Sequence, residues 1–182
     1  MKYLKLSAAA VAAVAALGIG AATAAAATPS PGSVHPRGLT CGSTVEFRNG
    51  GAGRVWDIQG ASMNNQTPIQ MYDPNGGWNQ QFQLCSSDTF PGYIISNPAS
   101  GKCVTVSNPS NANFSTLALD PCVGSVNQDF QFEDATVAGE EVVSIGSGKC
   151  VDIGNFNFNA GVVLQQFTCN GGRNQLFFMN AV

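Results

Sequence analysis

The sequence predicts an all-β domain built from three copies of one unit of about 48 residues. Three observations lead to this prediction. Segments that begin at Arg54, Lys102 and Lys149 align with one another with few gaps. Apolar residues alternate within each segment, which is the period of a β-strand. After residue 40 no stretch has a sustained helical period, and clusters of Gly, Asn and Pro separate the apolar runs as turns do.

The spacing of equivalent residues defines the three repeats. Asp57, Thr105 and Asp152 are 48 and 47 residues apart in the sequence. The same spacing separates the glutamines that open three Gln-x-Phe triplets, namely Gln80, Gln128 and Gln175. We therefore expect repeats at about 41–88, 89–135 and 136–182.

Four short strands are expected in each repeat, or about twelve in all. The first strands are the apolar runs at 45–47, 93–95 and 141–145. The second strands follow from the alternating pairs Trp56/Ile58, Val104/Val106 and Val151/Ile153. Pairs of the same kind, Ile69/Met71 and Leu117/Leu119, indicate further strands. Trp56 is expected in the core, because its counterparts in the other repeats are valines.

The N-terminal segment has the features of a secretory signal. Lys2 and Lys5 precede an Ala/Val/Leu run that ends in small residues, and cleavage after Ala27 fits an A-x-A site. A buried or membrane-spanning helix is the alternative interpretation of this run. We expect residues 1–27 to be the signal, 28–40 a Pro/Ser-rich leader, and the mature protein to be secreted and extracellular, with no membrane span.

The composition is polar without being charged. Only 10% of the residues are Asp, Glu, Lys or Arg, and 16 Asn and 11 Gln outnumber the 19 charged side chains. A nucleic-acid partner is excluded, because binding nucleic acid needs a basic surface. Low charge agrees instead with a neutral, hydroxyl-rich ligand.

Three such repeats closing one core look like a β-trefoil with pseudo-threefold symmetry. The triplets Gln80-Gln81-Phe82, Gln128-Asp129-Phe130 and Gln175-Leu176-Phe177 resemble the repeat signature of the ricin-type β-trefoil lectins, or family 13 carbohydrate-binding modules. That family prefers Trp where all three repeats have Phe, and the resemblance spans roughly residues 41–182. A propeller is the competing architecture for repeats of this length, but three blades are fewer than propellers use.

Six cysteines, all after residue 40, indicate three disulfides in an exported chain. Sequence alone allows 15 connectivities. In the repeat register Cys103 aligns with Cys150 and Cys122 with Cys169, so one bridge within each of repeats two and three is the economical arrangement. Cys41 and Cys85 then pair by elimination. A metal site is disfavoured because no C-x-x-C motif occurs and the only histidine, His35, lies in the leader.

Strand alternation separates core residues from candidate ligand-binding residues. Asp57, Gln70 and Tyr72 have the phase opposite to the core, so they are expected to face outward together. Repeat three matches with Asp152, Gln165 and Phe167. Repeat two has Thr105, Ala118 and Asp120 at these positions, so it is expected to be silent.

The resemblance implies a sugar pocket in each of repeats one and three. Carried over by position, the carbohydrate-binding residues are Asp57, Gln70, Tyr72, Asn79 and Gln80 in repeat one, and Asp152, Gln165, Phe167, Asn174 and Gln175 in repeat three. A carboxylate and an amide can hold neighbouring hydroxyls, and an aromatic ring can cover the C–H face of a pyranose. The Asn-Gln pairs recur in repeat two, which favours a role in the scaffold as well.

We therefore expect a lectin or stand-alone carbohydrate-binding module without cofactor or metal. The resemblance implies galactose- or xylan-type sugars, with a separate glycoside hydrolase or a cell-surface glycan as partner. An enzyme is not expected, because a glycoside hydrolase needs two facing carboxyls. Adjacent acidic pairs such as Glu140-Glu141 would point to opposite faces of a strand. The alternative is a trefoil that binds a protein, such as a protease inhibitor or a toxin-targeting subunit.

Overall fold

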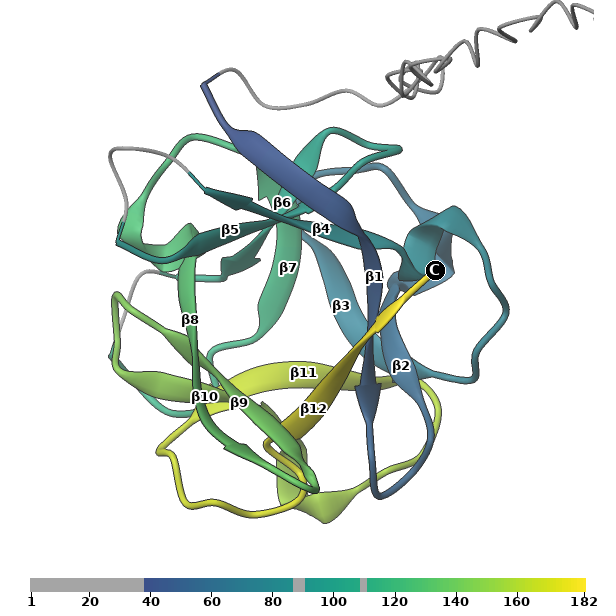
Figure 1. The fold of residues 1–182 in the computed structure, drawn as a ribbon, viewed down its shortest axis with the longest axis vertical. Coiled ribbons are helices and arrows are strands. Elements are labelled where there is room, and N and C mark those ends of the chain that lie inside the picture. Colours follow the sequence, from purple (N-terminus) through teal and green to yellow (C-terminus); the bar gives the residue numbers. More distant parts are fainter. Residues whose placement is uncertain (1–37, 87–90, 109–110) are drawn as a thin grey trace, which may run out of the picture.

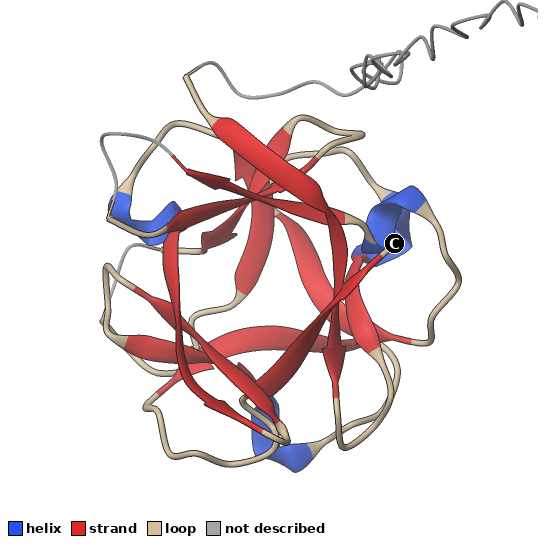
Figure 2. Ribbon diagram, viewed as in Figure 1, coloured by secondary structure: helices blue, strands red, loops and turns tan. Residues whose placement is uncertain are grey.

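The computed structural model describes residues 38–86, 91–108 and 111–182. Figure 2 shows that this part of the chain consists of β-strands joined by loops and a few short helical turns. The predicted signal and most of the predicted leader lie outside the described residues. Within the described part, no helix has the length and apolar character needed to cross a bilayer.

The strands follow the three predicted repeats, four to a repeat (Figure 1). Repeat one holds β1 (Thr40–Asn49), β2 (Val55–Ile58), β3 (Thr67–Tyr72) and β4 (Phe82–Ser86). Repeat two holds β5 (Tyr93–Asn97), β6 (Lys102–Val106), β7 (Leu117–Pro121) and β8 (Asp129–Thr136). Repeat three holds β9 (Gly139–Ser144), β10 (Lys149–Ile153), β11 (Val162–Phe167) and β12 (Leu176–Ala181). The predicted all-β class is confirmed.

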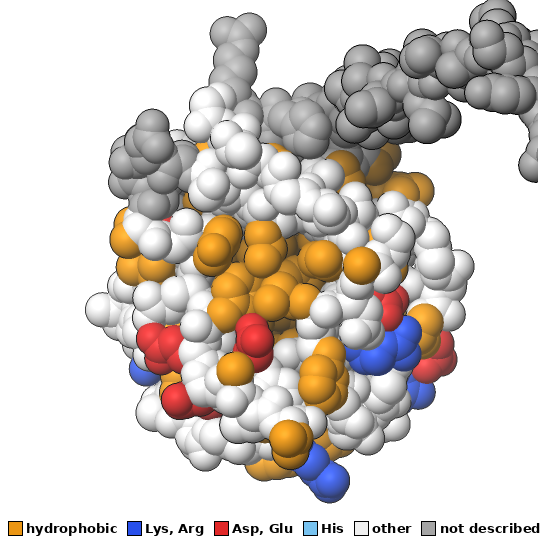
Figure 3. Space-filling model, in the orientation of Figure 1, with side chains coloured by type: hydrophobic (Ala, Val, Ile, Leu, Met, Phe, Trp, Pro, Cys, Tyr) orange, Lys and Arg blue, Asp and Glu red, His pale blue; other side chains and the backbone are white. Residues whose placement is uncertain are grey.

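Six of these strands close a barrel. β1 pairs with β4, β4 with β5, β5 with β8, β8 with β9, β9 with β12, and β12 returns to β1. Closure leaves none of these six strands as an edge, which removes a surface for aggregation. Figure 3 shows apolar side chains gathered in a hollow in the middle of the face that Figure 1 views.

The remaining strands form three hairpins, β2–β3, β6–β7 and β10–β11. The hairpins contact one another in turn, because β3 pairs with both β11 and β7, and Thr116 bridges to Gln165. A six-stranded barrel with three mutually paired hairpins, one from each repeat, is a β-trefoil. The fold predicted from the repeats is therefore confirmed.

The core is aromatic at the predicted positions. Phe82, Phe130 and Phe177, the aromatic members of the three triplets, are at most 1% exposed. Trp56 is also fully buried and stacks on Phe47, with ring centroids 4.3 Å apart. Each such side chain contributes about 1.5–3 kcal/mol on burial. Phe thus replaces Trp in the signature without leaving the core.

Three disulfides join the predicted pairs. Cys41–Cys85 links the paired strands β1 and β4. The other two bridges each close one hairpin at its base, in repeats two and three, and they are Cys103–Cys122 and Cys150–Cys169. Repeat one has Val55 and Pro74 at the positions of those cysteines. The repeat register therefore assigned the connectivity correctly.

Candidate functional site

The hairpin of repeat one brings its predicted site residues together. Asp57 on β2 is paired in register with Gln70 on β3, and Gln70 Nε2 donates to Asp57 Oδ1 at 2.9 Å. Tyr72 follows two residues after Gln70 on the same face. The shared face is as predicted, but outward exposure is not. Asp57 and Gln70 are only 2% and 5% exposed, whereas Tyr72 is 43% exposed.

Coverage by short helical turns explains this burial. The 3-10 turns η1 (Gln59–Ala61) and η2 (Trp78–Gln80) follow β2 and β3 and contact both the hairpin and each other. Gln59 at the start of η1 donates to Gln70 Oε1 at 3.1 Å. Alternation along a strand predicts which face a residue takes, but it carries no information about a loop that covers that face.

Asp57 is the centre of an amide network. Its Oδ2 accepts hydrogen bonds from Asn79 Nδ2 at 2.6 Å and Gln80 Nε2 at 2.9 Å. Burial raises the pKa of the Asp57 carboxyl above its ordinary value, because desolvation outweighs the hydrogen bonds donated by Gln70 and Gln80. We call this carboxylate with its three amide donors the hub of repeat one.

Repeat three builds the same hub around Asp152, which is 3% exposed. Gln165 Nε2 donates to Asp152 Oδ1 at 2.9 Å. Asn174 Nδ2 and Gln175 Nε2 donate to Oδ2 at 2.7 and 2.9 Å. A carboxylate can accept about four hydrogen bonds. In each hub the aspartate Oδ1 can therefore accept one more hydrogen bond. The glutamine that donates to Oδ1 has a second N–H on the same Nε2 atom, next to this position.

Repeat two has the framework of a hub without the carboxylate. Gln128 Nε2 donates to Thr105 Oγ1 at 2.8 Å, and Ala118 stands where the other repeats have glutamine. Asp120, at the position of the exposed aromatic residue, is bonded by Gln66. At the positions of the hub and of Tyr72, repeat two therefore offers neither a carboxylate centre nor an aromatic ring.

The triplet glutamines Gln80 and Gln175 connect each hub to the loop that follows the second strand of its hairpin. Gln80 is 2% exposed, and its side chain also bonds two backbone groups of the loop that precedes it. It accepts a hydrogen bond from Asn75 N at 2.8 Å and donates one to Asp73 O at 3.0 Å. Gln175 repeats this arrangement and is fully buried. Neither glutamine is among the residues that line the cavity beside its own hub. In this structure the side chains of these two predicted site residues bond to the aspartates and to the loop backbone.

The other eight predicted residues line two cavities. The repeat-one cavity, about 290 Å³, is lined by Asp57, Gly60, Ala61, Gln70, Tyr72, Asn75 and Asn79. The repeat-three cavity, about 200 Å³, is lined by Phe114, Asp152, Asn155, Phe156, Gln165, Phe167, Asn170 and Asn174. A smaller hollow of about 70 Å³ between repeats two and three has no carboxylate in its lining.

Sequence reasoning missed several lining residues. Asn75 and Asn170 occupy equivalent positions 95 residues apart, the same separation as Asp57 and Asp152, so comparison of the repeats could have found them. Phe114 could not be found in that way, because it belongs to repeat two and reaches the site of repeat three.

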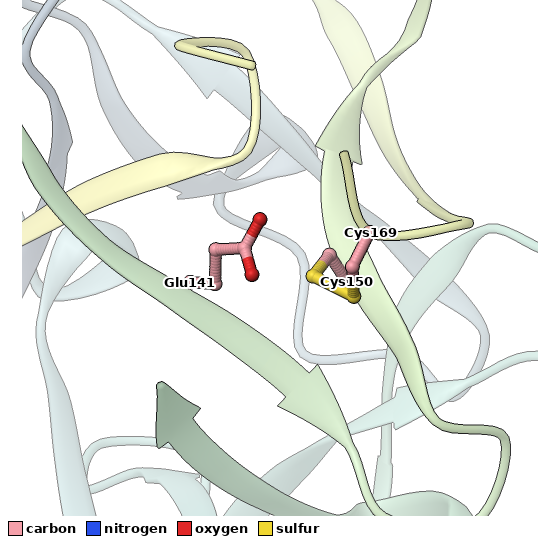
Figure 4. Close-up of side chains that lie close together, drawn as sticks. All are labelled: Glu141, Cys150 and Cys169. Atoms are coloured by element: carbon pink, nitrogen blue, oxygen red, sulfur yellow. A yellow bond between two sulfur atoms is a disulfide. The ribbon is translucent and has the colours of Figure 1, made fainter. Parts of the chain in front are cut away.

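One further group of potential metal ligands lies close together in the described residues. The side chains of Glu141, Cys150 and Cys169 have ligand atoms within 4.8 Å of one another (Figure 4). The two sulfurs are joined in a disulfide, and Glu141 accepts a hydrogen bond from the Gly171 backbone at 3.1 Å. Oxidised sulfurs are not metal-binding thiolates, so this group is not a metal site.

Comparison with known proteins agrees with this architecture. A family model described as a ricin-type beta-trefoil lectin domain matches residues 43–177. No curated protein sequence matches the chain.

Two solved structures illustrate the similarity. A designed threefold-symmetric protein, ThreeFoil, is 26% identical with a TM-score of 0.71, over 76% of this chain and 99% of that one. An exo-beta-1,3-galactanase from Clostridium thermocellum is 27% identical with a TM-score of 0.72, over 77% of this chain. The matched region is only 30% of the galactanase chain, so the resemblance is to one part of that protein.

A third structure shares the fold at lower identity. The ricin B-like lectin of Macrolepiota procera, solved in complex with lactose, is 18% identical with a TM-score of 0.66. The alignment covers 79% of this chain and 98% of that lectin.

Proposed function

The chain belongs to the ricin-type β-trefoil lectin family, and we propose that it is a secreted carbohydrate-binding protein with sugar sites in repeats one and three. One observation carries the proposal. The same buried carboxylate hub occurs twice, in repeats one and three, each time at a cavity with an aromatic side chain in its lining. Repeat two has Thr105 in place of the aspartate and Asp120 in place of the aromatic residue.

The hubs have the chemistry that a vicinal diol requires. In each, one oxygen of the aspartate can accept a hydrogen bond from a sugar hydroxyl, and the neighbouring glutamine amide can donate one to the next hydroxyl. Hydrogen bonds to a charged group contribute about 1.5–3 kcal/mol. The three amide donors fix the carboxylate before the ligand arrives, which lowers the entropic cost of binding.

The aromatic residues supply the apolar half of the site. Tyr72 is 43% exposed beside Asp57, and Phe167 is partly exposed beside Asp152. A flat ring of this kind covers the C–H face of a pyranose while the hydroxyls bond to the hub. No Lys or Arg lines either cavity, which favours a neutral sugar. We propose galactose- or xylan-type sugars, and the similarity to part of a galactanase supports testing galactosides first.

Binding without catalysis fits the arrangement of the hubs. Each aspartate is surrounded by amides, and neither cavity contains a second carboxyl among its lining residues. Hydrolysis of a glycosidic bond uses a pair of carboxyls on either side of it. The chain therefore acts as a lectin or carbohydrate-binding module, beside a separate glycoside hydrolase or on a cell-surface glycan.

Three disulfides support export, because such bridges persist in oxidising compartments. We expect the exported protein to begin at Thr28, after removal of the 1–27 signal. Intact mass of the secreted protein tests this, and a mass that retains residues 1–27 would contradict it.

A glycan array on the exported protein tests the proposed function. We expect binding to galactosides or xylans, and a loss of at least about tenfold in the Asp57→Ala/Asp152→Ala double variant. Thr105→Ala is the matched control. Thr105 has the position of the two aspartates in repeat two and accepts a hydrogen bond from Gln128, but it is not among the lining residues of either candidate cavity. A blank array, together with capture of one stoichiometric protein partner, would support the protein-binding alternative and overturn the proposal.

A further inference from the structure

One turn of each repeat reaches the hairpin of the next repeat. The backbone N–H of Gln66 donates to Leu119 O at 3.0 Å, that of Phe114 to Gln166 O at 2.9 Å, and that of Gly161 to Met71 O at 2.8 Å. Met71 and Gln166 each precede the aromatic residue of a candidate site. The three donors Gln66, Phe114 and Gly161 occupy equivalent positions in the repeats, and all have positive φ, at 59°, 72° and 86° respectively.

The side chain at this turn position is different in each repeat, and so is the side chain that lies beside each candidate site. Gly161, beside the repeat-one site, has none, and no atom lies within 4 Å of where its Cβ would be. Gln66 bonds to Asp120 and closes off the position in repeat two. Phe114 is 63% exposed, and its ring centroid lies 5.3 Å from that of Phe167, at an interplanar angle of 62°.

A second position shows the same contrast between the two sites. Phe156 in η4 (Gly154–Phe156) lines the repeat-three cavity and is 53% exposed. Its equivalent at the repeat-one cavity is Ala61. Both have left-handed backbone, with φ of 52° and 48°. The repeat-three site thus carries two phenyl rings where the repeat-one site has a glycine and an alanine.

The fold does not need either ring. Gly161 makes the same backbone hydrogen bond as Phe114, so the turn forms without a side chain. Left-handed backbone is unfavourable for a bulky residue, and an exposed phenyl ring gains little from burial. Strained residues that cluster at a cavity indicate a function there.

We propose that Phe114 and Phe156 make the repeat-three site select a sugar that carries a second flat, apolar-faced ring. This inference rests on the proposed function. The hub around Asp152 binds the hydroxyls of the first ring, and Phe167 covers its C–H face. Phe114 continues the apolar surface beyond Phe167, so a following pyranose or an aryl group can lie on it. The repeat-one site, without these rings, binds a single sugar unit.

Glycoside pairs measure this selectivity. Methyl and p-nitrophenyl β-galactosides and β-xylosides provide the aryl test, and galactose against lactose provides the test for a second sugar. Asp57→Ala isolates the repeat-three site, and Asp152→Ala isolates the repeat-one site. Tyr72→Ala is a second way to weaken repeat one that leaves its hub in place. Saturation-transfer NMR titration gives the dissociation constants.

We expect the aryl-to-methyl affinity ratio to be roughly three- to tenfold higher in Asp57→Ala than in Asp152→Ala. Adding Phe114→Gly and Phe156→Ala to Asp57→Ala should bring the ratio down to that of repeat one. The reciprocal pair, Gly161→Phe and Ala61→Phe in the Asp152→Ala variant, should raise it. Val137→Ser, at a fully exposed hairpin residue, is the surface control and should leave the ratio unchanged.

The outcomes separate this inference from the proposed function. Equal ratios in the two isolated sites, or a ratio unaffected by loss of Phe114 and Phe156, would overturn the inference while glycoside binding remains. If the unmodified protein binds none of the glycosides, both the proposed function and the inference fail. An advantage for p-nitrophenyl glycosides without one for lactose assigns the second ring to an aryl group.

Discussion

At the scale of single residues, the candidate sites depend on two aspartates that are buried among amides. Asp57 is 2% exposed, yet a neutral Asn79 and Gln80 hold its Oδ2 where an ion pair would be usual. Neutral donors only partly offset the cost of desolvation, which is why the pKa of Asp57 is raised. A ligand hydroxyl that donates to this carboxylate favours its ionised form.

The raised pKa of Asp57 predicts pH-dependent binding at the repeat-one site. The ionised carboxylate accepts the ligand hydroxyl, so affinity is constant above the raised pKa and falls as the pH drops through it. The fall begins at a higher pH than the ordinary aspartate value of 3.8 would give. Below the pKa, affinity should decrease up to about tenfold per pH unit.

Titration of the Asp152→Ala variant with a methyl glycoside, between neutral pH and about pH 3, below the ordinary aspartate value, checks this prediction. Circular dichroism at each pH confirms that the protein stays folded. Constant affinity down to the acid end of this range in folded protein would exclude Asp57 as the acceptor.

At the scale of secondary-structure elements, the sequence predicted about twelve short strands, four to a repeat, whereas the pairing of the strands came from the structure. Alternation placed Trp56 and Ile58 in the core, and the spacing of cysteines identified all three disulfides. The burial of Asp57 was missed, because it depends on how η1 and η2 fold over the hairpin. Phe114 was missed because it acts on the neighbouring repeat, and an alignment of repeats compares positions without placing them next to each other.

The buried glutamines of the triplets are predicted to be part of the scaffold. Gln128 is 1% exposed and bonds Thr105, Pro121 O and two backbone N–H groups, which ties β6 to η3 (Val126–Gln128) and the loop before it. Gln128→Ala would leave those groups unpaired, so it should lower the free energy of unfolding by about 1–3 kcal/mol. Because repeat two has no carboxylate hub, sugar affinity should stay the same.

Urea denaturation and a glycoside titration of the same preparation check both parts of that prediction. Gln80→Ala is the comparison, because it should lose similar stability and also weaken binding by releasing Asp57. Weaker sugar binding in folded Gln128→Ala would show that repeat two contributes a site.

At the scale of the whole molecule, the trefoil places one hub framework in each of three repeats around a closed barrel. Two frameworks carry an aspartate and the third carries Thr105. Two weak sites on one rigid body can bind a polymer or a cell surface together, which raises the apparent affinity without new contacts. The sites differ in their apolar walls, so the two need not recognise the same part of a glycan.

Mapping the bound sugar onto the backbone tests the central claim most directly. Amide NMR shifts of the labelled protein are recorded during titration with the glycan that binds best on the array. We predict two clusters of perturbed amides, one around Asp57 and Tyr72 and one around Asp152 and Phe167, with no change around Thr105. Perturbations centred on Thr105, or spread outside both cavities, would contradict sugar binding at the two carboxylate hubs.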